Sequence, residues 1–198
     1  MINASPERGA RALSCALLAS TVLSANAPAR ECRGVAFPDR IRVDASDLSL
    51  NGLGVRKATF LKVNVYVAAL YVARPTHDVN ALIASNEPQE LILHFVRNVG
   101  ANDLKRAWTE NFARIAPTQI DALRGRFAML NSWMTDVKSG QRFTFLRRPG
   151  VGIQVSIAGA LKGTISGDDF ARAFLAIWLG PNPPHPELRA GLLGGPCG

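Results

Sequence analysis

The sequence contains few residues of the kinds that hold metal ions, with three cysteines and three histidines in 198 residues. His77, His94 and His185 stand far apart, and none has a cysteine or carboxylate at the spacing of a metal site. The apolar runs also fall short of the ~20 residues that a membrane-spanning helix needs. The sequence therefore predicts neither a metal site nor a transmembrane segment.

Motifs for nucleotide cofactors and for hydrolytic catalysis are missing as well. There is no glycine-rich phosphate loop, and no serine or cysteine nucleophile stands in a recognisable arrangement with a histidine. The segment "NGLGVR", residues 51–56, has the glycine spacing of half a dinucleotide fingerprint. The residues after it predict a strand instead of the helix that the fingerprint requires. We therefore predict no cofactor.

Acidic residues are fewer than basic ones: 15 aspartates and glutamates stand against 23 lysines and arginines, so the formal net charge is +8. Such an excess can favour nucleic acid, anionic lipid or an anionic small molecule. The basic residues are spread along the chain, and their tightest cluster is the pair Arg147 and Arg148 beside a turn. Since neither a basic helix nor a sheet motif studded with aromatic residues is present, we predict no binding of nucleic acid.

The first thirty residues have the three parts of a secretory signal: basic Arg8 and Arg11, an apolar stretch from Ala12 to Leu23, and then small residues. Cleavage after Ala27 would leave an unfavourable proline at the new N-terminus, and cleavage after Ala29 is the alternative. We predict a signal peptide over residues 1–29, one domain over residues 30–198, and export to the periplasm. A misassigned start or a disordered tail is the competing interpretation.

Export changes the meaning of the cysteines. Cys15 would leave with the signal, and it precedes most of the apolar stretch, which disfavours a lipoprotein anchor. The mature chain would keep Cys32 near one end and Cys197 near the other. In an oxidising compartment these two can form a disulfide that ties the termini together. Two free thiols or an intermolecular link remain open, as does the oligomeric state.

Strands are predicted where β-branched and aromatic residues gather between turn residues. Four such segments precede the helical part of the chain: residues 40–43, 48–56, 60–73 and 91–96. Three more follow it, separated by "PGVG" and "GA" as in a β-meander: residues 141–148, 152–158 and 161–165.

Helices are predicted where apolar residues recur at steps of three and four after a capping residue. Asp78 caps a helix through Ser85, Asn102 caps a helix to Ile115, and a further helix follows Pro117. Their apolar stripes are Leu104, Trp108, Phe112 and Ile115, then Ile120, Leu123, Phe127, Leu130 and Met134.

Two helices are predicted near the C-terminus. Ser166 and Asp169 resemble a capping box that opens a helix through Trp178, and a short helix covers residues 187–192. Strands, two helices, a meander and more helices make an α+β protein whose helices gather on one face of a large, mainly antiparallel sheet.

Arg56 is the most prominent candidate for a ligand contact. It follows two glycines and precedes one of the longest apolar, β-branched runs of the chain. Its planar guanidinium can bind a carboxylate or enolate oxygen, and the glycines would let backbone and ligand approach closely. The competing interpretation is that Arg56 only satisfies carbonyl groups or a surface acid. The three tryptophans sit at helical spacings that favour core packing.

Several segments together resemble the bacterial chalcone isomerase-like proteins, many of which are exported. The resemblance covers Leu50 to Gly194 and implies a chalcone isomerase-like open-faced β-sandwich, with a ligand cleft between the sheet and the helices. Plant members of this family close a chalcone into a flavanone, and other members bind fatty acids without chemistry. The segments are "LNGLGVR…FLKVNVYVAALYV", "LHFVRNV…AWTENF", "LNSWMTDVKSGQRFTF" and "GTISGDDFARAFLAIWLG".

The resemblance also implies which residues line that cleft. Arg56 matches the family's arginine, Asn111 its helix asparagine, and Tyr66 its strand threonine. Leu104 stands where the isomerases have a tyrosine, and Ala171 where they have a late threonine or serine. These two departures argue against efficient flavonoid chemistry, because the enolate formed in that reaction needs positioned donors.

Three functions follow as alternatives. The first is an exported, non-catalytic binder of an amphipathic anion such as a fatty acid. Its predicted ligand-binding residues are Arg56, Tyr66, Leu104, Trp108 and Asn111. The second is an isomerase, an intramolecular lyase, that acts on another conjugated ketone through Arg56, Tyr66 and Asn111. The third is a structural envelope protein.

Overall fold

The computed structural model describes Met1 and residues 28–58, 63–115 and 120–198, with the side chains of Ile115 and Ile120 left out. The predicted signal peptide falls almost entirely on residues 2–27, which lie outside the described residues. The start of the strand predicted over 60–73 and the start of the helix predicted after Pro117 lie outside them too.

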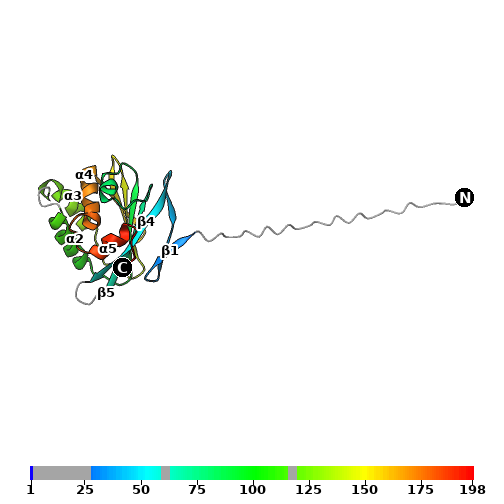
Figure 1. Cartoon of the computed structure of the whole chain (residues 1–198), viewed down its shortest axis with the longest axis horizontal. Coiled ribbons are helices and arrows are strands. Elements are labelled where there is room, and N and C mark those ends of the chain that lie inside the picture. Colours follow the sequence, from blue (N-terminus) through cyan, green and yellow to red (C-terminus); the bar gives the residue numbers. More distant parts are fainter. Residues whose placement is uncertain (2–27, 59–62, 116–119) are drawn as a thin grey trace.

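A seven-stranded antiparallel sheet forms the centre of the molecule (Figure 1). Its strands lie side by side in the order of the sequence, so each strand pairs with the one before it. The predicted strands and the meander are present, and β4 and β5 are the longest strands of this sheet. The strands are β3 (Arg40–Val43), β4 (Ser46–Ala58), β5 (Val63–Val72), β6 (Gln89–Phe95), β7 (Arg142–Arg148), β8 (Gly152–Ile157) and β9 (Ala160–Ser166).

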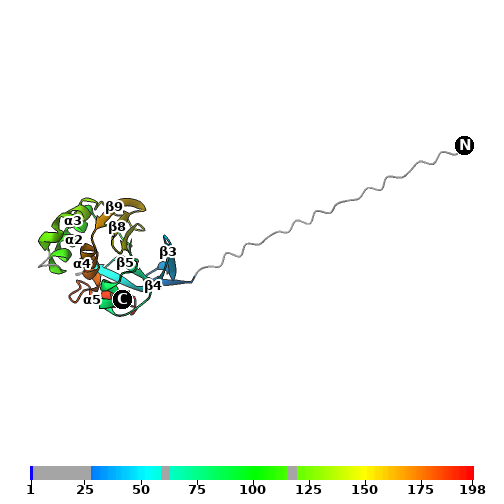
Figure 2. The ribbon, with the colours of Figure 1, turned by 90° about the horizontal axis from the view of Figure 1, so that it is seen from above.

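The described helices lie on one side of this sheet (Figure 2), and their buried apolar residues form one core cluster with residues of that face. Alternate residues of β5, such as Ala68 and Leu70, point into this main core, as expected for the two-residue period of a strand. None of the described helices is long and apolar enough to cross a membrane. The helices are α1 (Val79–Ala84), α2 (Ala101–Ile115), α3 (Ile120–Ser132), α4 (Asp168–Leu179) and α5 (Pro186–Leu192).

A hairpin that the sequence patterns do not predict covers part of the opposite face. It consists of β1 (Ala29–Cys32) and β2 (Val35–Pro38), which pair only with each other. Phe37 is fully buried there, beside Val67 and Tyr71 of β5. The Tyr71 hydroxyl donates a hydrogen bond to the Pro38 carbonyl oxygen over 2.9 Å. The two faces of β5 therefore enter two separate apolar clusters.

Two predicted helix caps are wrong. α2 begins at Ala101, and the backbone amide of Ala101 donates to the Asp136 carboxylate over 2.8 Å, so Asn102 lies inside the helix. α4 has Gly167 at its N-cap without a side-chain hydrogen bond. The Asp169 carboxylate instead accepts two hydrogen bonds of 2.7 Å from Arg126 of α3. At α2 an acid from a distant segment takes the place of the local cap, and at α4 a distant arginine binds the carboxylate that was expected to form the capping box.

The glycines of "NGLGVR" let the backbone of α5 cross directly over β4. A Cβ atom at Gly52 would overlap the carbonyl oxygens of Gly191 and Leu192, and one at Gly54 would overlap the backbone of Leu188. The expectation that these glycines admit a ligand is therefore wrong, because helix backbone fills the space. Beside these glycines, the side-chain amide of Asn51 donates a hydrogen bond of 2.8 Å to the Leu192 carbonyl oxygen and fixes the end of α5.

The segment after α5 returns to the N-terminal hairpin. Cys32 and Cys197 are joined by a disulfide, with their Cα atoms 5.9 Å apart, across a sequence separation of 165 residues. Arg33 also donates hydrogen bonds to the carbonyl oxygen of Gly198. The last fifteen residues are thus held at β4 and at the hairpin, on both faces of the sheet.

Candidate functional site

A cavity of about 260 Å³ lies between the sheet and the helix layer, at the end of the main core. β4, β5 and β6 supply one wall, and α2 and α4 supply another. Val99, the segment that leads into α5, and Leu188 of α5 complete the lining. Its apolar lining consists of Val65, Leu93, Phe95, Val99, Leu104, Ala107, Trp108, Ile177, Trp178, Pro183, Pro184 and Leu188. Its polar lining consists of Arg56, Tyr66, Asp103, Arg106, Glu110, Asn111 and His185.

All five residues predicted to bind a ligand line this cavity. They come from three elements: the consecutive strands β4 and β5, and the more distant helix α2. Trp108 and Leu104 face it from α2 and are buried, and Asn111, one turn further along α2, is half-buried. The residues are Arg56, Tyr66, Leu104, Trp108 and Asn111.

Arg56 and Tyr66 are directly opposite each other on neighbouring strands. The register pairs them immediately before a β-bulge at Lys57, and the guanidinium carbon of Arg56 lies 5.9 Å from the centre of the Tyr66 ring. Among the described residues, no carboxylate pairs with Arg56 and no carbonyl oxygen accepts a hydrogen bond from it. The guanidinium therefore contributes positive charge to the cavity wall, beside the face of an aromatic ring.

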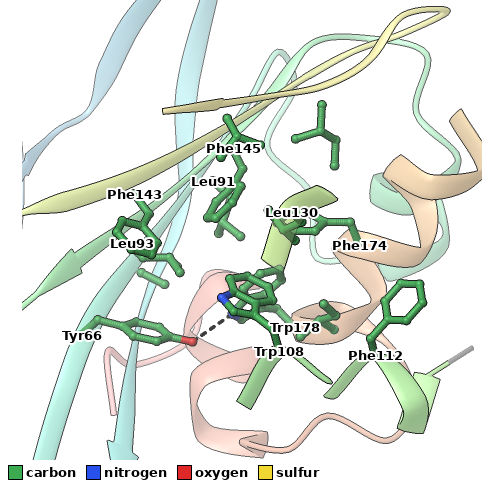
Figure 3. Packing of buried hydrophobic residues seen from close by; sticks show 14 of the residues in the cluster. Tyr66, Leu91, Leu93, Trp108, Phe112, Leu130, Phe143, Phe145, Phe174 and Trp178 are labelled. Carbon is green, nitrogen blue, oxygen red and sulfur yellow. Dashed lines mark hydrogen bonds between the residues drawn. The ribbon is translucent and has the colours of Figure 1, made fainter. Parts of the chain in front are cut away.

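Trp178 of α4 fixes the hydroxyl of Tyr66. Its indole N–H donates a hydrogen bond of 3.1 Å to the Tyr66 oxygen, deep in the aromatic core (Figure 3). Trp108 packs edge-on against Trp178 with ring centres 5.5 Å apart. Because the indole occupies an acceptor position of the phenol oxygen, the hydroxyl proton of Tyr66 remains available for a further acceptor.

The Tyr66 phenol stays protonated at neutral pH. Burial raises its pKa above the ordinary value, and this effect outweighs the positive charge of Arg56 and the hydrogen bond from Trp178, which both lower the pKa. Tyr66 therefore acts as a neutral hydrogen-bond donor in the cavity, and a phenolate base is not available there at neutral pH.

An alkaline titration tests this state of Tyr66. The chain has two tyrosines, and burial also raises the pKa of Tyr71, to about 12. The pKa of each tyrosine is higher in the folded protein than in the unfolded protein. The two buried phenols therefore contribute to the free energy of unfolding below pH ~10, and this contribution is lost as the pH rises through the pKa values of the folded protein. We expect little tyrosinate ultraviolet absorbance from native protein at pH ~10, and half-ionised tyrosine from unfolded protein. Half-ionisation of native protein at that pH would contradict the buried phenol.

The two positions that depart from the isomerase pattern differ in where they lie. Leu104 lines the cavity and presents an apolar side chain where the isomerases have a tyrosine. Ala171 is fully buried in α4 within the main core, and it does not reach the cavity. The cavity therefore has no hydroxyl donor from either position.

Sequence reasoning missed Trp178 and His185, and it also missed the charged residues of α2 that line the cavity, Asp103, Arg106 and Glu110. Trp178 follows the helical spacing of a core residue, and its hydrogen bond to Tyr66 depends on how α4 packs on β5. His185 lies in a proline-rich segment without any motif, and it reaches the cavity only because α5 crosses β4. No local pattern in the sequence carries a signal for either role.

Comparisons with known proteins identify a family and a fold for this chain. The sequence model of the chalcone isomerase-like family matches residues 29–194. No curated protein matches the chain in sequence. Among solved structures, a fatty-acid binding protein of Arabidopsis thaliana superposes with a TM-score of 0.64, over 84% of this chain and 96% of that chain. At 16% sequence identity this likeness shows the fold alone, and it confirms the predicted fold class.

Proposed function

This chain belongs to the chalcone isomerase-like family, and we propose that it binds an amphipathic anion such as a fatty acid in the cavity between sheet and helices. The observation that carries the proposal is Arg56, whose charge stands on the wall of a largely apolar cavity without a carboxylate partner among the described residues. A guanidinium in such a place favours an incoming carboxylate, because the pair gains charge-assisted hydrogen bonds away from bulk water.

The polar lining suits a carboxylate better than a neutral head group. An ionised carboxylate only accepts hydrogen bonds, and three of the predicted residues in the lining can donate them: the guanidinium of Arg56, the hydroxyl of Tyr66 and the side-chain amide of Asn111. The rest of the lining is aromatic and aliphatic, as an alkyl chain requires. A fatty-acid binding protein with the same fold provides a precedent for this use of the architecture.

The departures from the isomerase pattern favour binding over catalysis. Leu104 lies in the cavity wall where an isomerase has a tyrosine hydroxyl, and Ala171 offers no late hydroxyl. Each missing donor to a developing enolate typically costs a few kcal/mol of transition-state stabilisation, about a hundredfold or more in rate. The remaining set of Arg56, Tyr66 and Asn111 can hold an anion without these donors.

Export is a further part of the proposal. A disulfide such as Cys32–Cys197 persists in an oxidising compartment and is rare in a reducing one. The basic, apolar and small-residue segments of the first thirty residues have the order of a secretory signal. The intact mass of protein recovered from the periplasm would show whether cleavage occurs, and whether it follows Ala27 or Ala29.

Removal of the Arg56 charge tests the binding function. Titration with dodecanoate should give Arg56→Ala a 10- to 100-fold weaker affinity than the unaltered protein, about 1.5–3 kcal/mol, as for other hydrogen bonds to charged groups. Arg56→Lys should fall in between, because it keeps the charge and loses the planar fork. Mass spectrometry of an extract should find an acid in the purified protein and none in Arg56→Ala.

Arg124→Ala is the matched control, because Arg124 is an exposed arginine on α3 that pairs with Asp121, away from the cavity. It should bind dodecanoate as the unaltered protein does. Equal affinity of Arg56→Ala and the unaltered protein, or no bound acid and no binding in the titration, would refute the proposal. Turnover of naringenin chalcone above the spontaneous rate, lost in Arg56→Ala, would instead establish the isomerase alternative.

A further inference from the structure

His185 has no role in the function described so far, although it lies on the wall of the same cavity. It occupies the segment between α4 and α5, directly after Pro183 and Pro184, which also line the cavity. Its side chain is half-buried, and among the described residues no hydrogen-bond partner of its imidazole is found. A half-buried imidazole without such a partner, next to a proposed anion site, is a candidate for contact with the ligand.

The electrostatic surroundings of His185 are positive on balance. Arg56 of β4 and Arg114 of α2 both oppose a proton on its ring. Glu187, two residues further on, is held by Lys57 over 2.9 Å. The other charged or titratable groups that line this cavity are Tyr66 of β5 and Asp103, Arg106 and Glu110 of α2. Lys105 of α2 and Arg189 of α5 lie on the same elements without lining the cavity.

The imidazole is therefore neutral in the empty protein at pH 7. Burial lowers the pKa of His185, the charges of Arg56 and then Arg114 lower it further, and together they bring it to about 4. An anion bound beside Arg56 would reverse the balance of charge, because it neutralises the guanidinium and adds a negative neighbour. The protonated ring could then donate to the anion as a second cation.

We propose that His185 is a second contact for the anionic head group and that it takes up a proton when the anion binds. The inference rests on the proposed function, since it concerns the same cavity and the same class of ligand. It adds a residue to the site and a dependence on pH. By linkage, affinity must rise as the pH falls, because the bound state holds the additional proton.

The size of the change in affinity with pH follows from the protonation equilibrium of His185 without the anion and from its equilibrium with the anion bound. If the bound anion restores His185 to an ordinary pKa of about 6.5, the affinity increases about tenfold between pH ~8 and pH ~5.5. The increase would stop near pH ~4, where the histidine of the empty protein is itself protonated. A histidine that only packs against the ligand, without a proton, would leave the affinity independent of pH.

Decyl sulfonate is the probe, because its head group stays ionised over this pH range and cannot itself produce the pH dependence. Calorimetric titration at pH ~6, in two buffers of different ionisation enthalpy, should show net uptake of a proton by the unaltered protein. His185→Gln should bind with an affinity that is nearly the same at pH ~8 and pH ~5.5, without proton uptake. His94→Gln is the matched control and should retain both effects, because His94 faces away from the cavity and accepts a hydrogen bond from Arg142.

The outcomes separate this inference from the function on which it rests. If neither decyl sulfonate nor dodecanoate binds, the proposed function fails and the inference fails with it. If decyl sulfonate binds without proton uptake and with an affinity independent of pH, the role of His185 is overturned and the binding function stands. If His185→Gln folds poorly, the role of His185 can be tested in the unaltered protein by nuclear magnetic resonance of its three histidines. The His185 ring must then titrate at a higher pH with decyl sulfonate than without it, and an unchanged titration would overturn the inference.

Discussion

Replacing Cys32 and Cys197 together with alanine is expected to lower the free energy of unfolding by about 4 kcal/mol. The disulfide closes a loop with a sequence separation of 165 residues, so its loss frees an unfolded chain that is otherwise strongly constrained. Because the bridge also holds the segment after α5, we expect weaker dodecanoate binding in the double variant. Urea denaturation followed by circular dichroism measures the first effect, and titration measures the second.

Reductant provides the control for this prediction. The unaltered protein should lose the same amount of stability when a reductant is added, whereas the double alanine variant should not respond to it. Equal stability of the oxidised and reduced unaltered protein would contradict a stabilising role for the bridge. Single replacements are a poorer test, because each leaves a thiol that can form an intermolecular disulfide.

Gly54→Ala is expected to destabilise the protein by about 3 kcal/mol and to weaken ligand binding. A Cβ atom at this position would overlap the carbonyl oxygen of Leu188, and it would stand 3.0 Å from the Leu188 Cα atom. Backbone must therefore move, and the backbone that moves belongs to α5, whose Leu188 side chain lines the cavity. Urea denaturation and dodecanoate titration of the same preparation measure the two effects.

Gly125→Ala is the matched control, because it makes the same chemical change where nothing lies within 4 Å of the new methyl group. Gly125 is an exposed residue inside α3, where alanine favours the helix by up to about 1 kcal/mol. This variant should be as stable as the unaltered protein or slightly more stable, with unchanged binding. If Gly54→Ala behaved like Gly125→Ala, the close contact between α5 and β4 would not constrain the fold.

Most secondary structure could be predicted because burial leaves a periodic pattern in the sequence. β5 alternates between two buried faces, and α2 places Leu104, Trp108 and Phe112 on one stripe. The predictions failed where a partner came from far away. The first amide of α2 uses Asp136, and the carboxylate of Asp169 uses Arg126 in place of a local capping box.

The candidate site was predictable to the extent that its residues belong to recognisable segments. Arg56 and Asn111 match positions of a family pattern, and Tyr66 is the cross-strand neighbour of Arg56 once the register is known. Trp178 and His185 could not be predicted, because helix packing brings them to the cavity. The glycines before Arg56 carried a real signal of close approach, but what approaches them is the backbone of α5.

The class of the fold can be inferred from the sequence alone, because the period of its apolar residues specifies which elements form and which face each one buries. The sequence also shows that a cationic side chain precedes the long apolar strand β5. The surroundings of that cation, by contrast, depend on how the strands and helices pack together. Whether an arginine is paired, exposed or presented to a cavity depends on side chains that meet through strand register and helix crossing, and such contacts leave no local pattern along the chain.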